Sequence, residues 1–231
     1  MTIGLRQRVA AELVGTAFLV MAVVGSGIAA QRLSPGDVGL QLLENSLVTG
    51  AALVALILAL QPVSAAFNPV VTLLELAHGL VTATEAGLSV AAQLVGGTAG
   101  CVLANLMFNL DAVTVSGHHR ATAGALLAEV VATAGLVLVI FASVRSGRQD
   151  TVAYAVGGYI TAAYWFTSST SFANPAVTVA RMFSDTFAGI APASAPGFVA
   201  MQLLGGGVGL GLLALLRPSG ASRLPTPGAT R

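Results

Sequence analysis

The most restrictive feature of this 231-residue chain is that its second half repeats motifs of its first half in the same order. The repeated segments are an Ala-Glu-x-Val-x-Thr-Ala run, an Asn-Pro segment and a Gln-Leu-x-Gly-Gly run. The paired positions are Glu12 with Glu129, Asn68 with Asn174, and Gln93 with Gln202. A fold for this chain must therefore be built from two similar units.

The composition places these units in a lipid bilayer. The chain is 55% hydrophobic and 8% charged, with a mean hydropathy of +0.87, which is far more apolar than a soluble domain of this length. Runs of about 20 apolar residues, the length that crosses a bilayer, occur six times. The predicted spans are Val9–Ala30, Leu40–Leu60, Gly87–Phe108, Thr122–Val144, Thr151–Thr167 and Pro196–Leu216. The expected fold class is an all-α membrane protein.

The two units must be inverted relative to each other, because each contains three spans, an odd number. The predicted organisation is a single membrane domain over residues 1–231, with a first repeat at 9–108 and a second at 122–216. Residues 217–231 are rich in Pro, Gly and Ser and are expected to form a disordered C-terminal tail.

A short apolar stretch begins at Asn68 in the first unit and at Asn174 in the second. About a dozen residues of helix reach only about 18 Å, so each stretch can enter the bilayer without crossing it. Asn caps the free N–H groups of a helix, and Pro69 and Pro175 suit the first helical position. Because the units are inverted, we expect two half-helices that meet near the midplane and line a pore.

The placement of arginine predicts the orientation, since cytoplasmic segments are rich in basic residues. Putting both termini on the cytoplasmic side of the inner (plasma) membrane assigns seven arginines to that side and three to the outer side. The cytoplasmic group is Arg6, Arg8, Arg145, Arg148, Arg217, Arg223 and Arg231, and the outer group is Arg32, Arg120 and Arg181. No basic cluster suits nucleic acid.

The paired Asn-Pro motifs in a duplicated six-span frame resemble those of the major intrinsic proteins, the aquaporins and glycerol facilitators, from about residue 9 to residue 216. The resemblance implies that Asn68 and Asn174 donate hydrogen bonds to the solute, and that Glu12 and Glu129 brace the re-entrant loops. It also implies a homotetramer with one pore per subunit. No cofactor is predicted. The residues that would stack the half-helices together are Pro69, Val70, Pro175 and Ala176.

The sequence departs from the family at the selectivity filter, where many members have Arg directly after the second Asn-Pro-Ala and this chain has Val177. Counting from the motifs places Val48, Ala162 and Ser171 at the other filter positions. This set predicts a wide and apolar constriction. The sequence resembles bacterial aquaglyceroporins associated with arsenic resistance, so water, glycerol-like polyols and undissociated arsenite, As(OH)3, are the expected solutes.

Other charged residues near the motifs allow alternatives. Arg181 lies four residues after Val177, one turn along the same helix face. It provides either a displaced positive charge at the outer vestibule or a rim charge that pairs with Asp185 or extends to the membrane interface. Glu75, at the matching position of the first half-helix, would then face the cytoplasmic mouth, where a surface role is expected for it. His118 and His119 lack a third ligand, so no metal site is predicted.

Other functional classes fit less well. The chain has no nucleophile elbow, phosphate loop or metal-ligand cluster, so no enzymatic activity is predicted. An ordinary water or ammonia channel is the first alternative. A secondary transporter is the second, because inverted repeats with broken helices also build transporters.

Overall fold

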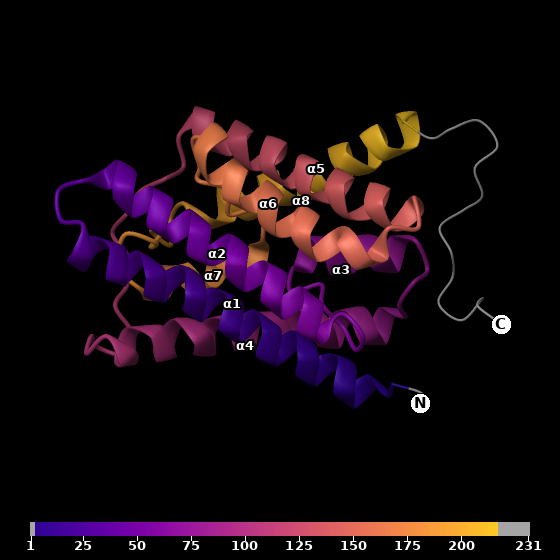
Figure 1. Cartoon of the computed structure of the whole chain (residues 1–231), viewed down its shortest axis with the longest axis horizontal. Helices are drawn as coiled ribbons and strands as arrows, with labels where there is room; N and C mark the ends of the chain where they lie inside the picture. The colour runs from indigo at the N-terminus through magenta and orange to yellow at the C-terminus, as the bar shows by residue number, and fades with distance from the viewer. Residues whose placement is uncertain (1–2, 217–231) are drawn as a thin grey trace.

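The computed structural model describes residues 3–216, and this part of the chain is helical, without a β-strand. The predicted tail at 217–231, with Arg217, Arg223 and Arg231, lies outside the described residues. Figure 1 shows long helices packed side by side along one axis, with two short helices between them. The elements are α1 (Leu5–Leu33), α2 (Val38–Leu60), α3 (Pro69–Ala77), α4 (Ala83–Met107), α5 (Ala123–Arg145), η1 (Gln149–Thr151), α6 (Val152–Phe166), α7 (Pro175–Ala180), η2 (Arg181–Phe183) and α8 (Ala195–Leu215).

Five of these helices, α1, α2, α4, α5 and α8, are long and apolar enough to cross a membrane. The sixth predicted span, 151–167, is shorter in the structure, because α6 has 15 residues and begins directly after the 3-10 turn η1. A helix of that length reaches only about 22 Å, so η1 extends this crossing by a turn.

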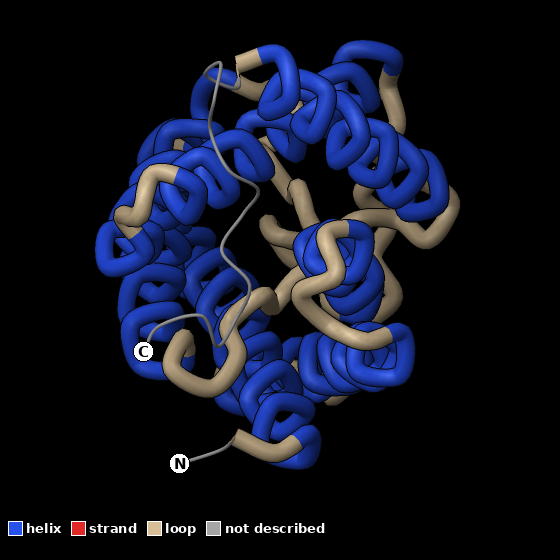
Figure 2. The backbone as a smooth tube through the Cα atoms, turned by 90° about the vertical axis from the view of Figure 1, so that its right-hand side faces the viewer, coloured by secondary structure: helices blue, strands red, loops and turns tan. Residues whose placement is uncertain are grey.

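The two short helices begin where the sequence predicts. Asn68 and Asn174 are extended N-cap residues whose side chains accept backbone N–H groups of α3 and α7, and a proline follows each of them. Viewed along the long axis, the long helices form a ring and the loops that lead into α3 and α7 lie inside it (Figure 2). The half-helices therefore start near the centre and run towards opposite ends.

Close helix crossings hold each half together, α1 against α4 and α5 against α8. A Cβ added to Gly100 would lie 2.1 Å from the carbonyl oxygen of Ala17, and one added to Gly209 would lie 2.8 Å from that of Ala134. Small residues allow this backbone approach, which is the usual way helices associate in lipid.

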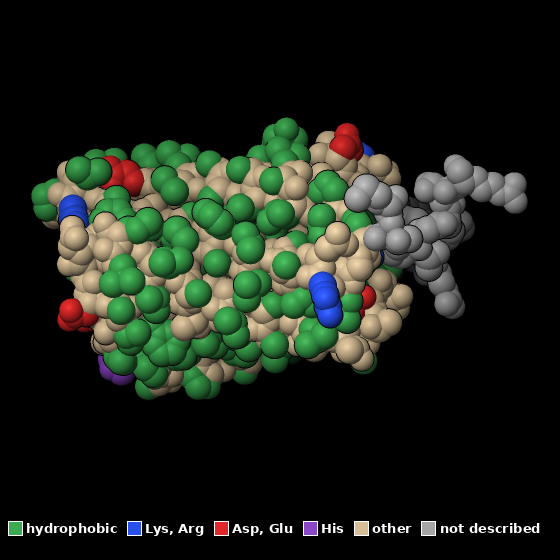
Figure 3. Space-filling model, turned by 90° about the horizontal axis from the view of Figure 1, so that it is seen from below, with side chains coloured by type: hydrophobic (Ala, Val, Ile, Leu, Met, Phe, Trp, Pro, Cys, Tyr) green, Lys and Arg blue, Asp and Glu red, His purple; other side chains and the backbone are tan. Residues whose placement is uncertain are grey.

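The outer surface agrees with a membrane location. In Figure 3, hydrophobic side chains cover the middle of the visible face, and most of the charged side chains lie towards the two ends. Large apolar side chains are exposed on several helices, among them Phe18 on α1, Val95 on α4 and Leu127 on α5. Exposed apolar area of this extent is stable in hydrocarbon and costly in water.

Candidate functional site: a central pore

A cavity of about 430 Å³ runs through the centre of the helix ring. The end of the cavity beside the N-terminal segment, here called the terminal mouth, is lined by Arg8, Gln61 and Glu85. The opposite end, here called the distal mouth, is lined by Phe172 and Arg181. One wall is apolar and comes largely from α2, α5 and α6. Its residues are Leu53, Ile57, Leu136, Ile140, Val144, Val152, Val156 and Ile160.

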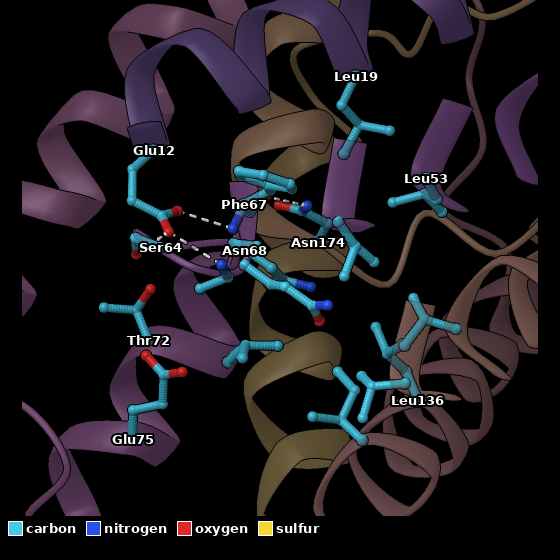
Figure 4. A pocket seen from close by; sticks show the side chains of 18 of the residues that line it. Glu12, Leu19, Leu53, Ser64, Phe67, Asn68, Thr72, Glu75, Leu136 and Asn174 are labelled. Carbon is cyan, nitrogen blue, oxygen red and sulfur yellow. Dashed lines mark hydrogen bonds between the residues drawn. The ribbon is translucent and has the colours of Figure 1, made fainter. Parts of the chain in front are cut away.

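Asn68 and Asn174 lie together in the cavity, as predicted from the repeat (Figure 4). Asn68 Nδ2 donates to the carbonyl oxygen of Ala173 at 2.8 Å, and Asn174 Nδ2 donates to that of Phe67 at 2.7 Å. Each side chain thus ties its own half-helix to the loop of the other half. An amide nitrogen carries two N–H groups, so one N–H of each Asn is left to face the cavity.

The residue before each Asn has a left-handed backbone, with φ 47° at both Phe67 and Ala173. This conformation is uncommon for residues with a side chain and persists only where the surroundings enforce it. In both loops the backbone N–H of this residue binds a buried glutamate and its carbonyl accepts the opposite Asn. The conformation aims both groups at fixed partners.

Glu12 on α1 supplies these contacts in the first half. Its carboxylate accepts the backbone N–H of Ala66 at 2.9 Å and that of Phe67 at 2.7 Å, together with the hydroxyl of Ser64 (Figure 4). Gln93 Nε2 donates to the same carboxylate at 2.7 Å. A carboxylate buried among helices is stable only with such a full set of donors.

Glu129 on α5 has the matching environment in the second half. It accepts the backbone N–H groups of Phe172 at 3.0 Å and Ala173 at 2.9 Å, and Gln202 Nε2 donates to it at 2.6 Å. Gln202 also donates to Thr178 on α7 at 2.8 Å. The sequence interpretation did not give the two glutamines a role, although they are paired positions of the repeat.

The predicted stacking residues lie at the start of the half-helices. Pro69 and Val70 open α3, Pro175 and Ala176 open α7, and all four side chains are buried.

Two of the four predicted filter residues line the cavity and two do not. Ser171 and Val177 are buried and face the cavity. Val48 is 44% exposed and lines a groove on the outer surface instead, and Ala162 is also exposed. These two predictions are wrong because they were counted from motifs on other elements, which does not fix how α2 and α6 are rotated about their axes. Since successive helical residues point about 100° apart, an error of one residue turns the side chain away from the cavity. The cavity is lined instead by Thr49 and Tyr164, whose hydroxyl oxygens lie 3.2 Å apart.

Arg181 is 2% exposed and lines the distal mouth. Its guanidinium carbon lies 3.5 Å from the centre of the Phe172 ring, and its Nε donates to the carbonyl oxygen of Ala188. Within residues 3–216 its two terminal nitrogens make no hydrogen bond to protein. The alternative in which Arg181 pairs with Asp185 is wrong, since Asp185 accepts the backbone N–H of Gly117 at 2.9 Å.

The terminal mouth carries more carboxylates. Arg8 donates to Glu85 at 2.8 Å, which joins α1 to α4. Glu75 on α3 is half-buried and lines the cavity, which agrees with the expected position facing the mouth and not with a purely surface role. Among residues 3–216, no group of His, Cys, Asp and Glu is arranged to hold a metal ion.

Comparison with known proteins assigns the family. The sequence profile described as major intrinsic protein matches residues 1–153. The chain belongs to the major intrinsic protein family. One relative of this major intrinsic protein, Aquaglyceroporin AqpS of Rhizobium meliloti (strain 1021), is 48% identical over 217 residues, which cover 93% of this chain and 92% of AqpS.

More distant relatives are also aquaporins or aquaglyceroporins. Aquaporin TIP4-4 of Zea mays is 35% identical over 67% of this chain and 62% of its own length. The aquaglyceroporin of Plasmodium falciparum superimposes with a TM-score of 0.70 at 19% identity, covering 92% of this chain and 97% of the other. The predicted aquaporin fold, six transmembrane helices with two re-entrant half-helices, is confirmed, and the family is one of membrane channels rather than enzymes.

Proposed function

We propose that this major intrinsic protein is a passive channel for small uncharged solutes that carry hydroxyl groups. The expected solutes are water, glycerol-like polyols and arsenous acid, As(OH)3. The observation that carries the proposal is Val177, a small apolar residue that faces the cavity directly after the second Asn-Pro-Ala motif. Without a guanidinium at this position, the constriction is wider and less polar.

The composition of the cavity wall supports the same solutes. One wall is apolar, whereas Asn68, Asn174, Thr49 and Ser171 offer polar groups along the cavity. Glycerol has a carbon backbone on one side and hydroxyls on the other, so it can contact both walls at once. The similarity to an aquaglyceroporin over 93% of the chain favours this class over a pore for water alone.

Arg181 supports the exclusion of ions in this proposal. Its guanidinium at the distal mouth would repel cations one helical turn beyond the filter, without narrowing the filter itself. The N-termini of α3 and α7 add two positive dipole ends at the centre of the pore. Together these groups would make the pore unfavourable for hydronium and metal cations.

We further propose that the terminal mouth faces the cytoplasm of a cell with the protein in its inner (plasma) membrane, because four of the seven arginines among residues 3–216 lie in segments on that side. These four are Arg6, Arg8, Arg145 and Arg148. The resemblance to the family supports a homotetramer in the lipid bilayer, with one pore in each subunit.

The test is stopped-flow light scattering on proteoliposomes, comparing entry of water, glycerol and As(OH)3 with protein-free liposomes. The proposal predicts rates that rise linearly with solute concentration and that do not change when a proton gradient is imposed. Water entry alone would reduce the protein to a water channel. Entry that saturates or follows the proton gradient would instead favour a secondary transporter.

A further inference from the structure

Two opposite charges occupy equivalent positions in the two half-helix segments. Glu75 is the seventh residue after Asn68, and Arg181 is the seventh residue after Asn174. Both side chains line the cavity, on opposite sides of the central asparagines. The pore therefore has a guanidinium donor towards its distal mouth and a carboxylate acceptor towards its terminal mouth.

The carboxylate of Glu75 takes no part in the interactions that stabilise the fold. Within residues 3–216 it makes no hydrogen bond and no ion pair, while the neighbouring Arg8 is paired with Glu85 at 2.8 Å. The carboxylate of Glu12 is occupied by the loop before α3. Figure 4 shows Glu75 beside Thr72 on one side of the cavity and Leu136 across from it. A polar group that lines a cavity without a protein partner is free to bind what passes through.

We propose that Glu75 is a solute-binding residue in the terminal half of the pore, where its carboxylate accepts hydrogen bonds from hydroxyl-bearing permeants. Across the cavity the wall at Leu136 is apolar, and the carboxylates of Glu12 and Glu85, which also line the cavity, already accept hydrogen bonds from the loop before α3 and from Arg8. A polyol therefore finds in Glu75 an acceptor without a protein donor among residues 3–216, and hydrogen bonds to an ionised acceptor are stronger than those to neutral groups. The proposal deepens the proposed function and rests on it, because it presumes that hydroxylated solutes enter the pore.

The protonation of Glu75 makes the idea testable. Burial, with the nearby charges of Glu12 and Glu85, raises the pKa of Glu75 to about 7, and Arg8 opposes the rise. These three groups are the charged neighbours that α1 and α4 present. Helix α8, which also packs on α3, contains no titratable residue, and His78 at the end of α3 is turned to Phe141 and the carbonyl of Leu74.

The direction of the effect follows from the sign of the charge. Above pH 7 the ionised carboxylate binds hydroxyl donors, and below pH 7 the neutral carboxyl binds them less strongly. The ratio of glycerol to water permeability in wild-type proteoliposomes is expected to fall about three-fold between pH 8.5 and pH 5.5, with a midpoint near 7. The same pH is set on both sides of the membrane.

Three variants separate solute binding from a structural role. Glu75→Gln is expected to give the low ratio at every pH, and Glu75→Asp to keep the pH dependence. Asp150→Asn removes the same charge from an exposed position in η1 that does not line the cavity, and it is expected to behave as wild type. A pH-independent glycerol-to-water ratio in the wild type would overturn the role of Glu75 alone. Water conduction without glycerol conduction at any pH would overturn the proposed solute class as well.

Discussion

At the scale of single residues, the loops of the pore depend on the two buried glutamates. Glu129 accepts two backbone N–H groups and the amide of Gln202. In Glu129→Gln the new side chain has nearly the same volume, but one carboxylate oxygen is replaced by an NH2 group, which cannot accept a hydrogen bond. At least one of the buried N–H donors that bind Glu129 is then left without an acceptor. This costs about 2 kcal/mol, so we expect the thermal unfolding midpoint in detergent to fall by about 4–8 °C, with slower glycerol entry.

The control for this residue-scale prediction is Glu44→Gln on α2. Glu44 is another glutamate in an apolar helix, but its one hydrogen bond comes from Ser34 at 2.7 Å and it lies in the outer groove, away from the cavity. We expect a smaller shift in the midpoint and unchanged glycerol entry for this variant. Equal shifts for Glu129→Gln and Glu44→Gln would show that the Glu129 network does not hold the loop.

At the scale of elements, the helix crossings of the two halves set how closely the ring of helices packs around the pore. A methyl group added at Gly100 meets backbone at 2.1 Å and one at Gly209 meets it at 2.8 Å, whereas one at Gly211 meets nothing within 4 Å. Forced separation of packed elements costs about 1–3 kcal/mol. We expect Gly100→Ala to lower the thermal unfolding midpoint most, Gly209→Ala less, and Gly211→Ala not at all. Equal midpoints for the three variants would mean that the helices can move apart at these crossings without a loss of stability.

At the scale of the whole molecule, the internal repeat predicted most of the fold, because each motif fixes a local structure wherever it occurs. Asn68 and Asn174 cap helices by their own side chains, and the burial of Glu12 and Glu129 follows from carboxylates within apolar spans. The wall of the filter was less predictable. Its position depends on how α2 and α6 rotate about their axes, which neighbouring helices decide. For this reason Thr49 and Tyr164, and not Val48 and Ala162, face the cavity.

Contacts between segments far apart in the chain could not be predicted from the sequence either. The left-handed backbone at Phe67 and Ala173 is held by a glutamate of the same half and by the Asn side chain of the opposite half. The placement of Arg181 on Phe172 depends on a loop carbonyl at Ala188. These features arise only when the two units meet, so a motif within one unit does not contain them.

The central claim is that Val177 widens the selectivity filter. Its most direct test is the glycerol-to-water permeability ratio of proteoliposomes that contain the Val177→Arg variant. The Val177→Ala variant is the control for the effect of any substitution at this position. The account predicts that Val177→Arg lowers the ratio about ten-fold or more, because a guanidinium narrows and polarises the constriction. Val177→Ala keeps the ratio at the wild-type value or above it. Glycerol entry through Val177→Arg at the wild-type rate, with water entry also unchanged, would contradict the claim that this position sets the selectivity of the pore.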